Sequence, residues 1–307
     1  MSLRYLVRRL GGIMIVLWII TIISFSLVRL SGGNPARLVL SESATDEDVR
    51  KVEIQMGLDR PVIEQYIRYL GNILRGDLGK SYYYNLPVVR LVGQRLPFTA
   101  RVALPTVIFA CCLCIPLGVT AGSNRGKPVD FAAMFFALLG QSMSTVWLAL
   151  FNVFFFSVWL GLLPTLGADS WKHYILPILT LGYPMAAEIT RVTRSGMIDT
   201  LGQDYITATL AKGVSRRAVN WKYALRNAMI PVATLLGMSL AGSLSGSVVV
   251  EVVYGFPGMG QLLVTAVNNR DYNMVQSLLL ISAFMFTIIN LIVDIINSFV
   301  DPRLKLE

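Results

Sequence analysis

The run Asp204-Tyr205-Ile206-Thr207-Ala208-Thr209-Leu210-Ala211-Lys212-Gly213 is a polar island between two apolar stretches that are each long enough to cross a membrane. An acidic residue opens this run and a glycine closes it, which is typical of a short helix with a favourable first turn and a C-terminal stop. Residue spacings of three and four place Tyr205, Ala208, Thr209 and Lys212 on one face of that helix.

The island continues as a basic segment through Arg216, Arg217 and Lys222 to Arg226 and Asn227. Such a segment is often only a solvated loop, or it binds lipid headgroups or an acidic partner. A chain with little soluble mass has no other need of a capped helix here, and small side chains along a helix fit the groove of a partner. The residues expected to dock are Asp204, Tyr205, Ala208, Thr209, Ala211, Lys212, Gly213, Arg226 and Asn227.

Composition indicates an integral membrane protein. The 307 residues are 54% hydrophobic and only 15% charged, whereas about 25% charged residues is usual for a soluble domain. The three cysteines, Cys111, Cys112 and Cys114, fall in one apolar run without a histidine partner, so neither a disulfide framework nor a zinc site is expected. The net charge of +9 follows membrane topology and gives no sign of nucleic-acid binding.

A bilayer-spanning helix needs about 20 mostly apolar residues. The runs that meet this length predict an all-α integral membrane protein with six transmembrane helices, at 10–28, 102–121, 131–161, 174–193, 228–250 and 272–293. The third is expected to be one long helix, followed by a re-entrant or surface turn near Pro164 and Gly167.

Orientation follows from lysine and arginine, which accumulate in short cytoplasmic loops. With the N-terminus inside, that side receives Arg4, Arg8, Arg9, Arg125, Lys127, the basic residues of 191–226, Arg303 and Lys305. The short outer loops receive only Lys172 and Arg270. Both termini are therefore expected in the cytoplasm.

The chain is expected to divide into four parts. Residues 1–30 form the N-terminus and first span, 31–97 a small extracytoplasmic helical insert, 98–300 the transmembrane core with a polar cytoplasmic loop at 196–228, and 301–307 a cytoplasmic tail. In the insert, Thr45 precedes three acidic residues at a helix start, and Pro61 suits the first position of a second helix ending near Arg75.

Catalysis has little support in this sequence. The single histidine, His173, lies at a predicted membrane edge, and neither a metalloprotease helix nor a serine-nucleophile elbow is present. No phosphate-binding glycine loop occurs either, so the chain is not expected to hydrolyse nucleotide or to bind a metal or cofactor itself. An intramembrane enzyme is the most remote function.

Acids within membrane segments are candidates for function. Glu251 and Asp294 lie close to span ends, which favours structural pairing, whereas Glu188 could pair with Arg191 or Arg194 or face a water-filled path. On the fifth span Ser239, Ser243 and Ser247 recur every four residues beside Gly242 and Gly246. That stripe fits tight helix packing and a translocation path equally well, so the candidate path residues are Glu188, Ser239, Ser243 and Ser247.

The chain resembles the membrane permeases of ATP-binding-cassette importers of the peptide/nickel class over nearly its whole length. The motifs that carry this resemblance are Gly33-Asn34-Pro35-Ala36-Arg37, Gly57-Leu58-Asp59-Arg60-Pro61, Gly76-Asp77-Leu78-Gly79, His173-Tyr174-Ile175-Leu176-Pro177, Asp204-Tyr205-Ile206, Ala211-Lys212-Gly213, Leu225-Arg226-Asn227-Ala228, Phe256-Pro257-Gly258-Met259-Gly260, Arg270-Asp271-Tyr272 and Asp301-Pro302-Arg303.

The resemblance implies a type I ABC importer permease fold in a bacterial cytoplasmic (inner) membrane. It also implies that the island is a coupling helix inserted in a cytoplasmic ATPase. The implied partners are a second homologous permease in a heterodimer, two ATPase subunits that bind ATP and magnesium, and an extracytoplasmic substrate-binding protein. Thr207 to Leu210 and Tyr223 depart from the family pattern, which concerns the details of ATPase contact.

The expected cargo is a dipeptide or oligopeptide, with glutathione, nickel or a metal chelate as alternatives on the same architecture. Residues 163–171 resemble glutathione-type and dipeptide-type members, and Asp294 to Asn297 resemble nickel-type members. A competing class of protein is a self-contained secondary transporter with Glu188 or Asp294 as its proton site.

Overall fold

A computed structural model describes residues 3–30 and 45–300, and within these ranges the regular structure is helical apart from one isolated bridge between Lys80 and Pro87. The motif 33–37, the motif 301–303 and the tail 301–307 lie outside the described residues. The helices in chain order are α1 (Leu3–Leu30), α3 (Asp46–Met56), α4 (Val62–Leu74), α5 (Val88–Ser123), α6 (Pro128–Ser142), α7 (Thr145–Asn152), the π-helix η1 (Val153–Trp159), α8 (Lys172–Leu201), α9 (Asp204–Ala211), α10 (Arg216–Ala218), the π-helix η2 (Val219–Ala224), α11 (Leu225–Leu244), α12 (Val248–Val253), α13 (Met259–Asn268) and α14 (Tyr272–Val300).

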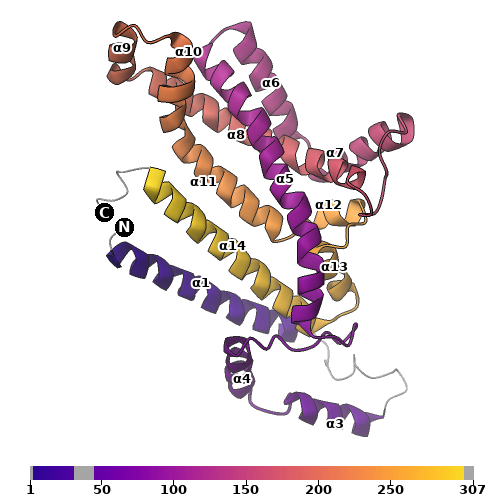
Figure 1. The fold of residues 1–307 in the computed structure, drawn as a ribbon. Coiled ribbons are helices and arrows are strands. Elements are labelled where there is room, and N and C mark those ends of the chain that lie inside the picture. Colours follow the sequence, from indigo (N-terminus) through magenta and orange to yellow (C-terminus); the bar gives the residue numbers. More distant parts are fainter. Residues whose placement is uncertain (1–2, 31–44, 301–307) are drawn as a thin grey trace.

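The long helices form a bundle, and shorter helices lie at each of its two ends. In Figure 1, α9 and α10 lie at one end, whereas α13, α3 and α4 lie at the other. Helix α8 packs against α5, α6 and α11, and α14 packs against α11 and α1. The α5–α8 contact is so close that a Cβ atom on Gly118 would lie 2.4 Å from Thr193 Cβ, so glycine is required there.

Among the residues that the structure describes, three single helices are long and apolar enough to cross a membrane. They are Val88–Ser123, Arg216–Leu244 and Tyr272–Ile295, and the pair α6 and α7–η1 passes the same test only together. Helix α8 occupies the fourth predicted span, and α1 contains the shorter apolar stretch Gly11–Ser26.

Two of the predicted spans were wrong in detail. The stretch 131–161 is not one long helix, because α6 and α7 meet at an angle of 101°. Ser144 caps α7 there by accepting a hydrogen bond from the backbone N–H of Trp147 at 3.2 Å. The span predicted at 228–250 ends at Leu244, because Gly246 adopts φ +102° and turns the chain into α12.

The segment between α1 and α5 contains the two expected short helices. Thr45 caps α3 in a reciprocal pair of contacts with Asp48. Hydrogen bonds from the Thr45 hydroxyl and from the Thr45 backbone N–H to the Asp48 carboxylate hold the pKa of that carboxyl below its usual value. Pro61 immediately precedes α4 instead of being its first residue. Helix α5 begins at Val88, inside the range 31–97 that was expected for the insert.

Several hydrogen bonds hold this segment against the bundle, to α1 and to α14. The hydroxyls of Tyr66 and Thr21 lie 2.9 Å apart and join α4 to α1. Asp271, at the start of α14, accepts hydrogen bonds from the Ser81 hydroxyl and from the backbone N–H of Tyr83. The segment therefore packs on the α13 end of the bundle.

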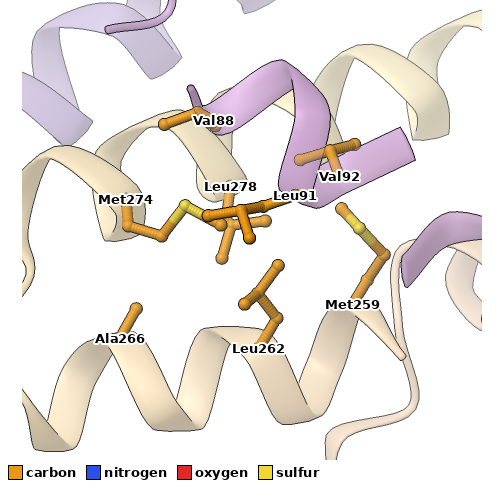
Figure 2. Packing of buried hydrophobic residues seen from close by; sticks show 8 residues of the cluster. All are labelled: Val88, Leu91, Val92, Met259, Leu262, Ala266, Met274 and Leu278. Atoms are coloured by element: carbon orange, nitrogen blue, oxygen red, sulfur yellow. The ribbon is translucent and has the colours of Figure 1, made fainter. Parts of the chain in front are cut away.

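A hydrophobic cluster fixes the α13 end. Figure 2 shows Leu91 pointing from α5 toward Leu262 of α13 and toward Met274 and Leu278 of α14. Its eight buried members are Val88, Leu91, Val92, Met259, Leu262, Ala266, Met274 and Leu278. Each truncation of a large side chain here is expected to cost about 2–5 kcal/mol, because the rigid helices around it close a cavity only in part.

Candidate functional site: helix α9 and the cavity between α8 and α11

Helix α9 has the boundaries that its end residues predict. Asp204 is its first residue, where a carboxylate is favoured by the helix dipole. The backbone N–H of Gly213 bonds to the Leu210 carbonyl at 2.9 Å, and Gly213 has φ +82°. That φ is unfavourable for residues with a Cβ atom, so the glycine ends the helix and returns the chain toward the bundle. Asp199 lies in the last turn of α8, ahead of this helix.

One side chain fixes α9 to the bundle. Ile206 is only 2% exposed and is the one fully buried residue of α9. It packs in a cluster with Val119 of α5, Met197 of α8, and Val219 and Ala224 of η2. The other predicted docking residues of this run point outward: Asp204, Tyr205, Ala208, Ala211, Lys212 and Gly213 are exposed, and Thr209 is half-buried.

A polar contact adds a second attachment. The side-chain amide of Asn227 donates to the Tyr205 hydroxyl at 2.7 Å and so joins α9 to α11. The Thr209 hydroxyl donates to the Tyr205 carbonyl at 2.7 Å, so this side chain is used within the helix. Arg226 is exposed beside this contact. The structure therefore brings Tyr205 and Asn227 together, whereas Lys212 and Arg226 are exposed and form no ion pair with the residues that the structure describes.

Large apolar and aromatic side chains of α9 and of η2 are exposed at the same end of the molecule. We call Tyr205, Leu210, Trp221 and Tyr223 the coupling surface, and each of them is between 37% and 44% exposed. Leu210 and Trp221 were not among the predicted docking residues. Trp221 could have been noticed as an aromatic residue between Arg217 and Lys222. The prediction for this segment rested on its charge alone.

An ion pair near the coupling surface was also missed. The Asp130 carboxylate at the start of α6 accepts two hydrogen bonds from the Arg194 guanidinium on α8, at 2.5 and 2.7 Å. It also accepts the backbone N–H of Gly126 at 3.0 Å. Asp130 is buried, so this pair fixes the loop before α6 to the helix that leads into α9.

A cavity of about 490 Å³ lies between α8, α11 and the bend that separates α6 from α7. It brings together all four candidate path residues: Glu188 from α8, Ser239 and Ser243 from α11, and Ser247 just before α12. Its other lining residues are Gln141, Met143, Thr145, Leu181, Pro184, Met185 and Gly242. An open cavity with a carboxylate, an amide and several hydroxyls can hold a small polar molecule.

The two arginines predicted as partners of Glu188 make other contacts. Arg194 binds Asp130, and the Arg191 guanidinium donates to the Gln141 side-chain carbonyl at the edge of the same cavity. Glu188 thus makes no ion pair within residues 3–30 and 45–300, and it is exposed to the cavity.

The remaining polar candidates have structural roles. Glu251 is buried and accepts the Thr99 hydroxyl at 2.7 Å and the backbone N–H of Gly260 at 2.6 Å. This pairing matches the structural interpretation of Glu251. His173 contacts the Ser170 hydroxyl at 2.9 Å in a local turn. The described residues contain no group of three histidine, cysteine or acidic side chains that could hold a metal ion.

Comparison with known proteins agrees with this arrangement. The family model described as "Binding-protein-dependent transport system inner membrane component" matches residues 114–306, and the model for the N-terminal part of such membrane components matches residues 2–103. Together these two models account for nearly the whole chain.

Individual relatives match over the same length. The glutathione transport system permease protein GsiC of Shigella flexneri is 39% identical over 303 residues, covering 99% of both chains. GsiC of Escherichia coli K12 is 38% identical with the same coverage. The methionine ABC transporter MetNI in an inward-facing conformation superposes with a TM-score of 0.57 at 18% identity, covering 69% of this chain and 97% of that one, and so shares the fold.

The exposed helix α9, the membrane-length helices, the two family models and the full-length relatives lead to one conclusion: the chain belongs to the inner membrane permease components of binding-protein-dependent transport systems, as a permease of the peptide/nickel class of ABC importers.

Proposed function

We propose that this permease forms half of a translocation pore with a second homologous permease, and that two ATPase subunits drive it from the cytoplasm. The observation that carries the proposal is the attachment of α9, where Ile206 is buried in the bundle while Ala208, Ala211 and Lys212 are exposed. A short helix that is held by Ile206 and by the Tyr205–Asn227 hydrogen bond, with its other side chains largely exposed, fits the groove of a partner subunit.

The attachment suggests how motion passes to the pore. Ile206 contacts side chains of α5, α8 and η2, and Asn227 connects α9 to α11. A displacement of α9 by the ATPases therefore reaches α8 and α11, which form two walls of the cavity. Closing and reopening of the cavity by these helices is the proposed alternating-access step.

The proposed topology has six membrane-spanning segments, with the bent pair α6 and α7–η1 as the third. The α9 end faces the cytoplasm together with both termini, and the segment with α3 and α4 lies on the extracytoplasmic side near a substrate-binding protein. In this proposal the extracytoplasmic insert is residues 31–97 and the transmembrane core is residues 98–300. The coupling loop is residues 196–228. ATP and magnesium are bound by the partner ATPases, and this chain needs no cofactor of its own.

The proposed cargo is a short peptide, which includes dipeptides, oligopeptides and glutathione. Full-length relatives at 38–39% identity are named glutathione transport permeases, and this favours glutathione among the three. Nickel or a metal chelate has less support, since no metal-holding group occurs among the described residues.

Reconstitution tests this proposal directly. The chain is purified with a second permease, two ATPases and a binding protein encoded beside it, and uptake of radiolabelled glutathione and dialanine into proteoliposomes is measured. ATP-dependent accumulation that needs all components supports the proposal. Transport by this chain alone along a proton gradient, without ATPases, would instead establish a secondary transporter.

A further inference from the structure

One charged side chain lines the cavity, and it is negative. Among the residues around this space Glu188 is the only one with a formal charge; the others are apolar, amide or hydroxyl side chains and glycine. Glu188 lies 16 residues after the start of α8 at Lys172, which at about 1.5 Å per residue places it roughly 24 Å along the helix. Glu188 also lies within the predicted span 174–193, toward its cytoplasmic end, and an acidic residue inside a membrane-spanning segment is usually retained for function.

The two arginines nearest to Glu188 in sequence make contacts with other residues. Arg194 forms its pair with Asp130, and Arg191 donates to Gln141. Within the described residues the carboxylate of Glu188 forms no ion pair, and Arg191, bonded to a neutral amide, lies at the edge of the cavity and not among its lining residues. Hydroxyl groups of Ser239, Ser243 and Ser247 line the cavity with Glu188. A cavity with this charge attracts cations and repels anions, because low-dielectric walls strengthen the field of a single charge.

We propose that Glu188 is a cation-binding position in the translocation path and that it receives the ammonium group of a peptide cargo as the cargo passes. A dipeptide, an oligopeptide or glutathione carries a free ammonium group at neutral pH. The serine hydroxyls on α11 can exchange hydrogen bonds with the peptide groups behind it. This inference rests on the proposed function, and the two experiments below separate the failure of one from the failure of the other.

The first experiment measures the charge preference of the cavity without any cargo. Ser243→Cys is introduced after Cys111, Cys112 and Cys114 have been replaced by alanine, and the assembled complex is placed in nanodiscs. The rates of modification by a cationic trimethylammonium-ethyl methanethiosulfonate and an anionic sulfonato-ethyl methanethiosulfonate are then compared. Adding Glu188→Gln should lower the ratio of cationic to anionic rates about fivefold, because one unit of negative charge leaves the cavity.

The matched control is Asp199→Asn, which removes the same charge from the same helix. Asp199 is exposed near the end of α8 and does not line the cavity, so the ratio should stay within twofold. A ratio that does not change with Glu188→Gln, or that already favours the anionic reagent before it, overturns the proposal.

The second experiment measures uptake of glutathione and dialanine by the reconstituted complex. Glu188→Gln should lower the uptake of the transported cargo at least fivefold, and Glu188→Asp should restore part of it. Uptake at the original rate with Glu188→Gln contradicts the proposal. Dissociation of the two permeases by Glu188→Gln also contradicts it, because the carboxylate would then pair with the partner and not with cargo. Absence of any ATP-driven uptake by the unmodified complex contradicts the proposed function instead, and leaves the thiol-modification ratio to decide the role of Glu188.

Discussion

The Asn227 side-chain amide donates a hydrogen bond to the Tyr205 hydroxyl at 2.7 Å, across 22 residues of sequence. This bond joins the first turn of α9 to the first turn of α11, and α11 in turn packs against α8, α5 and α14. It therefore completes a mechanical connection that Ile206 begins on the other side of α9. A displacement of α9 is passed on to the bundle through these two attachments, and a weaker attachment passes on less of it.

Loss of the Tyr205 hydroxyl should weaken this connection without unfolding the chain. Tyr205→Phe removes one exposed hydrogen bond, which contributes about 1 kcal/mol or less. We expect the uptake of cargo per ATP hydrolysed to fall severalfold, because α9 can then tilt without moving α11. The measurement is parallel uptake and phosphate release in proteoliposomes. Tyr83→Phe is the control, since this exposed tyrosine lies in the segment at the α13 end of the bundle, and an equal effect of both variants would refute the connection.

The backbone at Gly213 should matter more than the space around it. A Cβ atom there would meet nothing within 4 Å, but φ is +82°. Gly213→Ala should cost about 1–2 kcal/mol through backbone strain alone, misplace the end of α9 and weaken ATPase co-purification. Gly213→Asn should be milder, because asparagine tolerates the left-handed region.

Gly202 provides the matched control for this test. It ends α8 with φ −80°, which every residue adopts, and a Cβ atom there would make only ordinary contacts at 3.7 Å. Gly202→Ala should therefore leave co-purification unchanged. If both alanine variants behave alike, the conformation of Gly213 is not what positions α9.

The Asp130–Arg194 ion pair should stabilise the fold, and the contribution of each residue should depend on the presence of the other. Asp130→Asn leaves the Arg194 guanidinium without its carboxylate, and breaking a buried pair typically costs about 3–5 kcal/mol. Arg194 is partly exposed, so a loss of about 2 kcal/mol is expected. The check is thermal unfolding in detergent of Asp130→Asn, Arg194→Gln and the double variant. The double variant should lose less than the sum of the single losses, and strict additivity would show that the two residues act independently.

Glu251 should control the start of α13 and not the coupling surface. Its carboxylate accepts the Thr99 hydroxyl and the backbone N–H groups of Gly260 and Gln261, at 2.6 to 3.0 Å. Glu251→Gln replaces one acceptor oxygen by a donor and should cost about 1–3 kcal/mol.

Hydrogen exchange by mass spectrometry can locate this effect. Amides of α13 (Met259–Asn268) should exchange faster in Glu251→Gln, whereas those of α9 should be unchanged. Faster exchange throughout the bundle would mean that Glu251 supports the whole fold and not the α13 end alone.

Local sequence patterns predicted the short helices well. The Thr45 cap fixed the start of α3, and Asp204 with Gly213 marked the ends of α9, because end residues act within one turn of the helix they terminate. The bend between α6 and α7 escaped prediction. Its signal is the polar stretch Gly140-Gln141-Ser142-Met143-Ser144-Thr145 inside a mostly apolar run, and the mean hydropathy of a whole span does not register a helix cap.

Long-range contacts could not be read from spacing. Asp130 and Arg194 are 64 residues apart, and only the packing of α6 on α8 brings them together. The serine stripe and Glu188 were both noticed as candidates for a path, yet their meeting in one cavity depends on how α8 and α11 cross. Leu210 and Trp221 were not predicted as docking residues, because the sequence of a membrane protein does not show whether an apolar side chain is buried in the bundle or exposed.

The most direct test of the account is replacement of Ala208, which is exposed on α9, by tryptophan. If α9 inserts into an ATPase, Ala208→Trp should abolish co-purification of the ATPases and ATP-driven uptake, while the thermal stability of the permease stays unchanged. Ala132→Trp, at an exposed position of α6, should retain both co-purification and uptake. Full assembly and full uptake with Ala208→Trp would contradict the assignment of α9 as the coupling helix.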